Sequence, residues 1–136
     1  MSRTIQIDMY GKTYYGIMAT IYSTMLGFED NGILTAMLHC SWTSGGIGVG
    51  GYRLDRPVKE THTSEGNAFG LDHVMKIMTT VGVSTWEELV GKHVIVLFPN
   101  EGTWGSSAIG IANATNENLL LDFKDHAESW KDREMT

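Results

Sequence analysis

The glycine-rich segment at residues 44–51 carries the strongest chemical signal in the sequence. Its Gly46, Gly48 and Gly51 satisfy the spacing G-x-G-x-x-G. That spacing predicts dinucleotide binding only where it follows a strand and opens a helix, because the helix N-terminus holds the pyrophosphate. Residues 52–57 have the pattern of a strand that ends at a proline. The sequence therefore argues against a Rossmann dinucleotide site.

The same segment has the parts of a different site, one for a phosphate-bearing small molecule. Successive glycine amides can form a concave nest that binds anions. Arg53, Arg56 and Lys59 follow directly and make this the most basic window of an acidic chain. Trp42 and Tyr52 flank the glycines and could stack on a base. The predicted ligand-binding residues are Trp42, Ser44, Gly45, Gly46, Gly48, Gly50, Gly51, Tyr52, Arg53 and Arg56.

A purely structural interpretation of these glycines stays open. A glycine-rich hairpin with a β-bulge would use its small residues to let another strand or a second subunit pack closely. Exposed sheet edges and the glycine-rich segment together favour a homo-oligomer.

The histidines do not form a recognisable metal motif. No pair has the H-x-H, H-x-x-x-H or H-E-x-x-H spacing of a local zinc site, so we expect no metal and no cofactor. Asp72 and His73 are neighbours on a predicted helix, and we expect them to form a solvent-facing pair. The five histidines are His39, His62, His73, His93 and His126.

The acidic pair Glu29–Asp30 and the thiol of Cys40 are reactive groups, but neither has the context of a catalytic site. Glu29 and Asp30 could do acid–base chemistry, but adjacent acids on a turn usually point apart into water. Cys40 belongs to the alternate residues that form the apolar face of its strand. Burial on that face raises the thiol pKa and makes the thiol a poor nucleophile. His39 should point to the opposite face of the same strand. No G-x-S-x-G elbow supports serine chemistry.

Strands are expected to position most of these residues. Apolar residues alternate over residues 4–10, which indicates a half-buried strand. Residues 14–26 carry apolar residues at both odd and even positions, so both faces of the expected strand are apolar. This pattern is typical of a central strand or of one that bends and changes faces. Asn31-Gly32 then predicts a hairpin turn to a strand at 33–42. A buried central strand is expected at 94–98, and a final hairpin from 108–112 and 119–123.

One amphipathic helix is predicted over residues 67–80, followed by Gly82 as its C′ residue. Its core-facing stripe is expected to be Leu71, Val74, Met75 and Met78. A capping box at 84–87 opens a short second helix through about residue 89. Residues 58–65 are expected to form a polar loop after Pro57, and residues 125–136 a polar tail or frayed helix.

These elements predict an α+β fold: a twisted, mostly antiparallel β-sheet that closes toward a barrel, with the amphipathic helix over one face and the short second helix beside it. At 136 residues the chain fits a single domain spanning 1–136.

The charge balance and the cysteine content indicate which partners and which cellular compartment to expect. A net charge of −6 argues against non-specific binding to nucleic acid or to an anionic membrane. A lone cysteine, Cys40, suits a reducing compartment. The N-terminal residues lack the apolar core of a secretory signal, and no segment has the length of a membrane span. We therefore expect a cytoplasmic protein without a nucleic-acid or membrane partner.

Residues 26–35, 44–54 and 86–94 together resemble a family of small, largely uncharacterised proteins of bacteriophages and prophages. In that family a Leu-Gly-x-Glu-Asp-His-Gly turn precedes a strand, and a Gly-Gly-Ser-Gly-Gln-Gly-x-Gly-Gly-Tyr segment follows. The order of these segments agrees here, over about half of the chain. Asn31 stands in place of the turn histidine, and Ile47 and Val49 replace more polar or aromatic residues, which changes the lining of any ligand site.

This resemblance implies a phage product acting in the bacterial cytoplasm, where small phage proteins often counter host defence. The leading hypothesis is a non-enzymatic protein that sequesters a nucleotide-like signal. One alternative is an inhibitor that binds a host protein through an acidic or methionine-bearing surface. A second alternative is a nucleotide hydrolase or lyase with Glu29, Asp30 or a histidine as the base.

Overall fold

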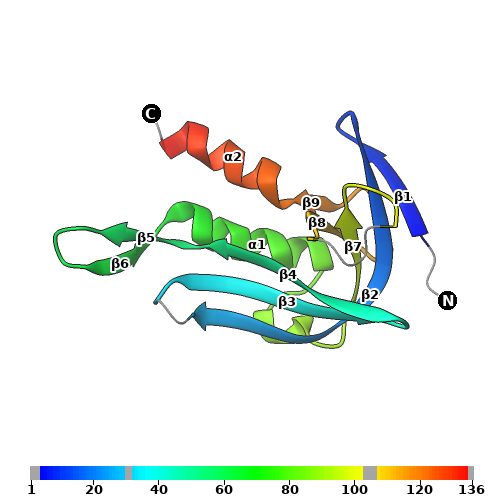
Figure 1. Ribbon diagram of the computed structural model, residues 1–136, viewed down its shortest axis with the longest axis horizontal. Helices are drawn as coiled ribbons and strands as arrows, with labels where there is room; N and C mark the ends of the chain where they lie inside the picture. Colours follow the sequence, from blue (N-terminus) through cyan, green and yellow to red (C-terminus); the bar gives the residue numbers. More distant parts are fainter. Residues whose placement is uncertain (1–3, 30–31, 103–106, 135–136) are drawn as a thin grey trace.

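The computed structural model describes residues 4–29, 32–102 and 107–134. Over these residues the chain has the expected α+β architecture, a curled antiparallel sheet with the form of a half-barrel and two helices packed against it (Figure 1). None of the described helices is long and apolar enough to cross a membrane.

Within the described residues, seven strands form the main sheet in the order β4-β3-β2-β7-β8-β9, and β1 pairs with β2. Both predicted hairpins are present, as β2–β3 and β8–β9. The turn residues Asp30 and Asn31 lie outside the described residues. The bounds are β1 (Thr4–Met9), β2 (Lys12–Phe28), β3 (Leu34–Trp42), β4 (Gly45–Arg53), β7 (His93–Phe98), β8 (Gly110–Asn113) and β9 (Leu120–Asp122).

The long strand β2 bends and changes faces, one of the two outcomes expected from its apolar pattern. Ile21 pairs with Cys40 and Thr24 with Leu38, and the register shifts between these two pairs. Such a bulge inserts one residue and reverses the side of each residue that follows. Ile17 and Ile21 are buried before the bulge, whereas the even-numbered Thr24 takes the side of buried Leu38 after it.

The central position of β7 is confirmed. It lies between β2 and β8, and its residues after His93 are all buried. Cys40 is also fully buried, and burial raises the pKa of its thiol to about 12, as its strand parity predicts.

Helix α1 (Ala68–Val81) has the predicted ends. The Asn67 side chain accepts a hydrogen bond from the Gly70 amide at 2.7 Å. Gly82 adopts a left-handed conformation and donates its amide to the Met78 carbonyl at 2.9 Å. A Cβ on Gly70 would clash with the Leu54 carbonyl, so the start of α1 packs directly on the chain that follows β4.

The predicted core face of α1 is wrong. Leu71 and Met75 are 68% and 51% exposed. The helix carries two apolar stripes, and the prediction chose the one without a histidine. The stripe that includes His73 is the one that faces the sheet. The expectation that His73 faces solvent is wrong for the same reason. The buried stripe is Phe69, His73, Ile77, Thr80 and Val81.

The expected polar loop at 58–65 is instead a separate ribbon, β5 (Asp55–Val58) paired with β6 (Thr63–Gly66). Pro57 pairs with Ser64 and does not end the strand, since a two-stranded ribbon has free edges where proline needs no partner for its nitrogen. The short second helix is a single 3₁₀ turn, η1 (Trp86–Leu89), preceded by Thr85. The Thr85 hydroxyl donates a hydrogen bond to the Glu88 carboxylate at 3.0 Å. The pair at the start of this turn is therefore 85 and 88, one residue later than the predicted capping box at 84–87.

The polar tail forms a second full helix, α2 (Phe123–Glu134), which begins at a residue predicted to end a strand. It packs on α1 through Asp72. Asp72 Oδ2 lies 2.7 Å from His126 Nε2 and accepts a hydrogen bond from Trp130 Nε1 at 3.0 Å. Burial alone would raise the pKa of Asp72, but the hydrogen bonds from His126, Trp130 and Lys76 lower it to about 2.

His73 lies where α1, α2 and β4 meet. Its ring is fully buried, and its centroid lies 5.4–5.9 Å from the rings of Phe69, Phe123, His126 and Tyr52. Neither ring nitrogen has a hydrogen-bond partner among the described residues. Burial, together with the charge on His126, lowers the pKa of His73 to about 4 against the opposing effect of Asp72.

We expect His73 to make the fold acid-sensitive. Its folded-state pKa of about 4 lies below the ordinary value of 6.5, so the unfolded chain takes up the proton first. Stability should therefore fall as the pH drops from 6.5 toward 4, by at most on the order of 3 kcal/mol. His73→Phe should remove most of this loss, measured as urea-unfolding free energies at pH 7.5 and 5.0. His62→Asn, at an exposed turn position, should retain it. An undiminished loss in His73→Phe would contradict this assignment.

Candidate functional site

The glycine-rich segment forms the edge strand β4, paired antiparallel with β3. Ser44 lies in the turn between the two strands, and Gly45, Gly46 and Gly48 lie in extended backbone. Extended amides alternate in direction along a strand, which does not create the convergent amides of a nest. Positive φ angles occur only at Gly50 (113°) and Gly51 (88°) in this segment, beside a register shift. The geometry is that of the bulged hairpin left open above.

Both predicted phosphate-binding arginines have carboxylate partners. Arg53 Nε donates to Asp55 Oδ1 at 2.9 Å, and Asp55 is almost fully buried. Burial would raise the pKa of Asp55, but the Arg53 hydrogen bond and charge help to hold it below its usual value. Arg56 pairs with Glu65 across the β5–β6 ribbon. Arg53 thus stabilises a buried charge, and Arg56 an exposed hairpin.

The two predicted stacking aromatics lie far apart. Trp42 pairs with Gly45 at one end of the hairpin, whereas Tyr52 lies seven residues further along β4, which is roughly 20 Å at the rise of a strand. Tyr52 turns inward and stacks on His73, with ring centroids 5.9 Å apart and planes inclined by 28°. Trp42 and Tyr52 therefore cannot hold the same base. The predicted ligand-binding residues are spread along the hairpin and the ribbon, and their ligand role stays a prediction.

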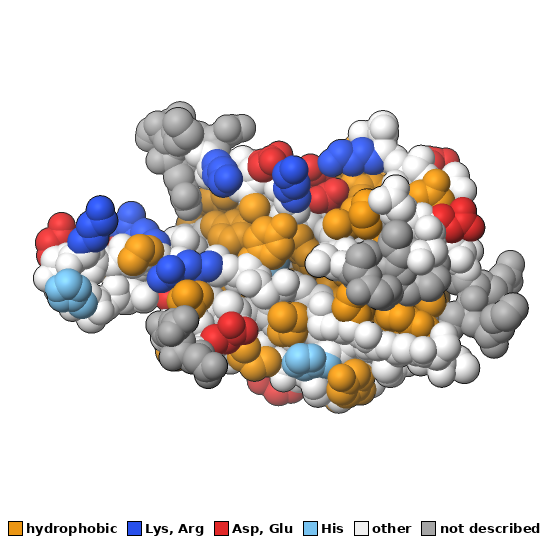
Figure 2. All heavy atoms as spheres, in the orientation of Figure 1, with side chains coloured by type: hydrophobic (Ala, Val, Ile, Leu, Met, Phe, Trp, Pro, Cys, Tyr) orange, Lys and Arg blue, Asp and Glu red, His pale blue; other side chains and the backbone are white. Residues whose placement is uncertain are grey.

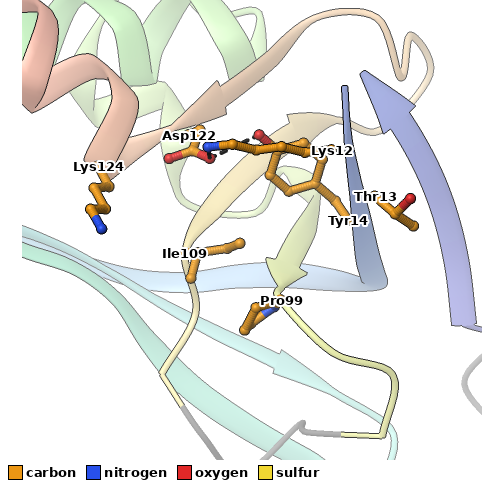
Figure 3. A pocket seen from close by; sticks show the side chains of 7 residues that line it. All are labelled: Lys12, Thr13, Tyr14, Pro99, Ile109, Asp122 and Lys124. Atoms are coloured by element: carbon orange, nitrogen blue, oxygen red, sulfur yellow. Dashed lines mark hydrogen bonds and ion pairs between the residues drawn. The ribbon is translucent and has the colours of Figure 1, made fainter. Parts of the chain in front are cut away.

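A cavity of about 390 Å³ lies elsewhere, beside the first residues of β2 (Figure 3). We call it the Lys12–Lys124 cavity. Its walls come from four separate parts of the chain: the start of β2, the end of β7, the approach to β8, and the β9–α2 junction. Its lining residues are Lys12, Thr13, Tyr14, Pro99, Ile109, Asp122 and Lys124.

One carboxylate organises the polar side of this cavity. Asp122 Oδ2 accepts a hydrogen bond from the Tyr14 hydroxyl at 2.8 Å, and its Oδ1 accepts one from the Asp125 amide at 3.1 Å. Lys12 Nζ lies 3.6 Å from Asp122 and 2.9 Å from Asp125. Burial, and then the contact with Asp122, raises the pKa of Tyr14 well above its usual value. The phenol therefore stays protonated, and the single charge of Lys12 faces the two carboxylates of Asp122 and Asp125.

Lys124 lies on the other side of the cavity from Lys12 (Figure 3). Its side chain is exposed, and it forms no ion pair with any described residue. Apolar Ile109 and Pro99 complete the wall. Lys124 is thus an ammonium group beside a mainly apolar hollow, and it is suited to bind an anionic ligand of modest size.

No local pattern indicates this cavity, because its lysines are 112 positions apart and each stands in an ordinary polar context. The acid–base groups considered above also lie elsewhere. Glu29 accepts a hydrogen bond from the Thr35 hydroxyl at 3.0 Å, and Asp30 lies outside the described residues. In the part of the chain that the structure describes, no three His, Cys, Asp or Glu side chains gather as a metal-ion cluster.

The two arginines should differ in their effect on stability. Arg53→Ala removes the partner of a buried carboxylate and should lower the free energy of unfolding by about 1–3 kcal/mol. Arg56→Ala removes an exposed pair and should change it by less than about 0.5 kcal/mol. Urea unfolding of the two variants would test this contrast. Equal, small effects would mean that Arg53 is free for another role.

The comparisons with known proteins give no further guide to function. No protein-family model, curated protein or solved structure matches the chain. The resemblance to small phage proteins therefore remains a prediction, and function has to be inferred from geometry and charge.

Proposed function

We propose that this protein binds a small phosphate-bearing molecule, and that the Lys12–Lys124 cavity receives its phosphate. The observation that carries the proposal is Lys124, a lysine on the cavity wall with no ion-pair partner among the described residues. The ligand class is the one expected from the sequence, but the location differs from the glycine-rich segment.

The Lys124 ammonium group favours an anionic ligand such as a phosphate over a neutral one. A phosphate group carries a charge of about −1.5 to −2 and several acceptor oxygens. Lys124 can donate charge-assisted hydrogen bonds to it, whereas the charge of Lys12 is offset by its ion pairs with Asp122 and Asp125. The net charge of −6 opposes the approach of an anion at long range. Recognition therefore depends on Lys124.

The chemistry of the cavity favours binding without turnover. Tyr14 is held protonated and donates its hydrogen to Asp122, so neither group is available as a free base. This agrees with the sequence-based hypothesis of a phage protein that sequesters a nucleotide-like signal in the host cytoplasm. In that role the protein acts stoichiometrically, and its effect depends on its concentration relative to the ligand.

A charge reversal at Lys124 tests the cavity directly. We expect Lys124→Glu to weaken binding of pyrophosphate and AMP at least tenfold in isothermal titration calorimetry, because it places a negative charge beside the phosphate. Lys59→Glu, in the turn of the β5–β6 ribbon, makes the same change in net charge and should alter binding much less. If both variants lose the same affinity, the cause is the change in net charge and not a contact at Lys124. Absence of anion binding by the unaltered protein would overturn the proposal.

A protein-binding role is the second candidate, and the exposed face of α1 favours it. Leu71 and Met75 lie four residues apart on one side of the helix, and both are more than half exposed. Adjacent exposed apolar side chains of this kind are typical of partner surfaces. Met75 makes this face the candidate for the methionine-bearing surface of an inhibitor of a host factor.

The two candidates give opposite results with one pair of variants. If α1 docks a host protein, Leu71→Ser/Met75→Ser should abolish recovery of a stoichiometric partner from bacterial lysate, and Lys124→Glu should not. Equal recovery with the unaltered and the doubly substituted protein would remove α1 from this role.

A further inference from the structure

A second, smaller hollow lies between β4, α1 and α2. It has a volume of about 160 Å³, and we call it the aromatic slot. Three aromatic side chains form most of it, with one small residue and two polar residues completing the lining. These residues are Tyr52, Phe69, Trp130, Ala127, Asn67 and Lys131.

The aromatic rings of the slot are held in place before any ligand arrives. Trp130 donates its indole N–H to Asp72, and the Arg133 guanidinium lies over its ring at 4.6 Å from the centroid. Tyr52 and Phe69 both contact the buried His73 ring, at 5.9 and 5.6 Å between centroids. Rings that are fixed in this way lose little entropy when a flat molecule stacks on them.

The slot is too small for a complete ligand of ordinary size. Binding pockets for such molecules are roughly 300–1,000 Å³, whereas 160 Å³ accommodates one planar ring system. The remainder of the ligand has to extend outside the slot. Lys131 is the positively charged residue of its lining.

Helix α2 connects the slot to the Lys12–Lys124 cavity. Lys124 lines the cavity, and Lys131 lines the slot. A spacing of seven residues places both on the same helix face, about 10 Å apart along the axis, with Ala127 between them. Hydrophobic side chains gather between α2 and β4 in the space-filling view, with both basic and acidic side chains at their rim (Figure 2).

We propose that the ligand is a nucleotide, whose base stacks in the aromatic slot while its phosphate lies at Lys124. The proposal rests on the phosphate-binding function inferred above and specifies its ligand class. It requires one planar group and one anionic group, joined by a spacer of sugar size along α2. It also gives Tyr52 the base-stacking role expected from the sequence, with Trp130 as its partner in place of Trp42.

The test compares phosphates with and without a base. Calorimetry with AMP, GMP, CMP and UMP should give at least one nucleotide that binds tenfold or more tightly than ribose 5-phosphate, because stacking contributes only when a base is present. Ala127→Leu should fill the slot and remove that advantage while ribose 5-phosphate binding is retained. Ser129→Leu, at an exposed position of the same helix, is the matched control and should leave both unchanged.

The possible failures of this test are distinguishable. If ribose 5-phosphate and all four nucleotides bind equally, or if Ala127→Leu leaves the nucleotide preference intact, the slot has no part in recognition and the inference is overturned. If none of these phosphates binds, the proposed function itself fails. Both proposals are supported if Lys124→Glu weakens the binding of ribose 5-phosphate and of the nucleotides, and Ala127→Leu removes only the preference for nucleotides.

Discussion

The pairing of β2 with three other strands is the constraint on which the rest of the structure depends. Its first residues pair with β1 and β7, and its later residues pair with β3. The bulge after Ile21 lets one strand serve both parts of the curled sheet. The same strand places Lys12 and Tyr14 beside Asp122, so the candidate cavity exists only once these distant pairings have formed.

Asp72 has a comparable role for α2. A single carboxylate on α1 contacts His126 and Trp130 of α2 and Lys76 of its own helix. These contacts hold a helix of polar composition against the rest of the fold. Both hollows on this side depend on α2, since Lys124 lines one, and Trp130 and Lys131 line the other. The shape of both hollows therefore depends on the docking of α2.

The glycine-rich segment shows how a pattern can have two physical causes. Gly50 adopts a positive φ, and a Cβ there would lie 2.7 Å from the Ala36 carbonyl oxygen. A Cβ on Gly46 would lie 3.0 Å from the Cys40 carbonyl oxygen. Close pairing of β4 with β3 thus accounts for two of these glycines without any ligand. Arg53 is likewise engaged by a buried acid, Asp55, which lies only two residues further along the chain.

The sequence by itself determined the α+β class, both main hairpins, the buried β7 and the ends of α1, because strand periodicity, turn residues and helix caps act over a few neighbouring residues. It did not determine which stripe of α1 is buried, since Phe69–His73–Ile77 and Leu71–Met75–Met78 are both apolar enough to face a core. Only the tertiary structure decided that choice, the docking of α2 and the meeting of Lys12 with Lys124. Each depends on contacts between residues far apart in the chain, for which local patterns carry no information.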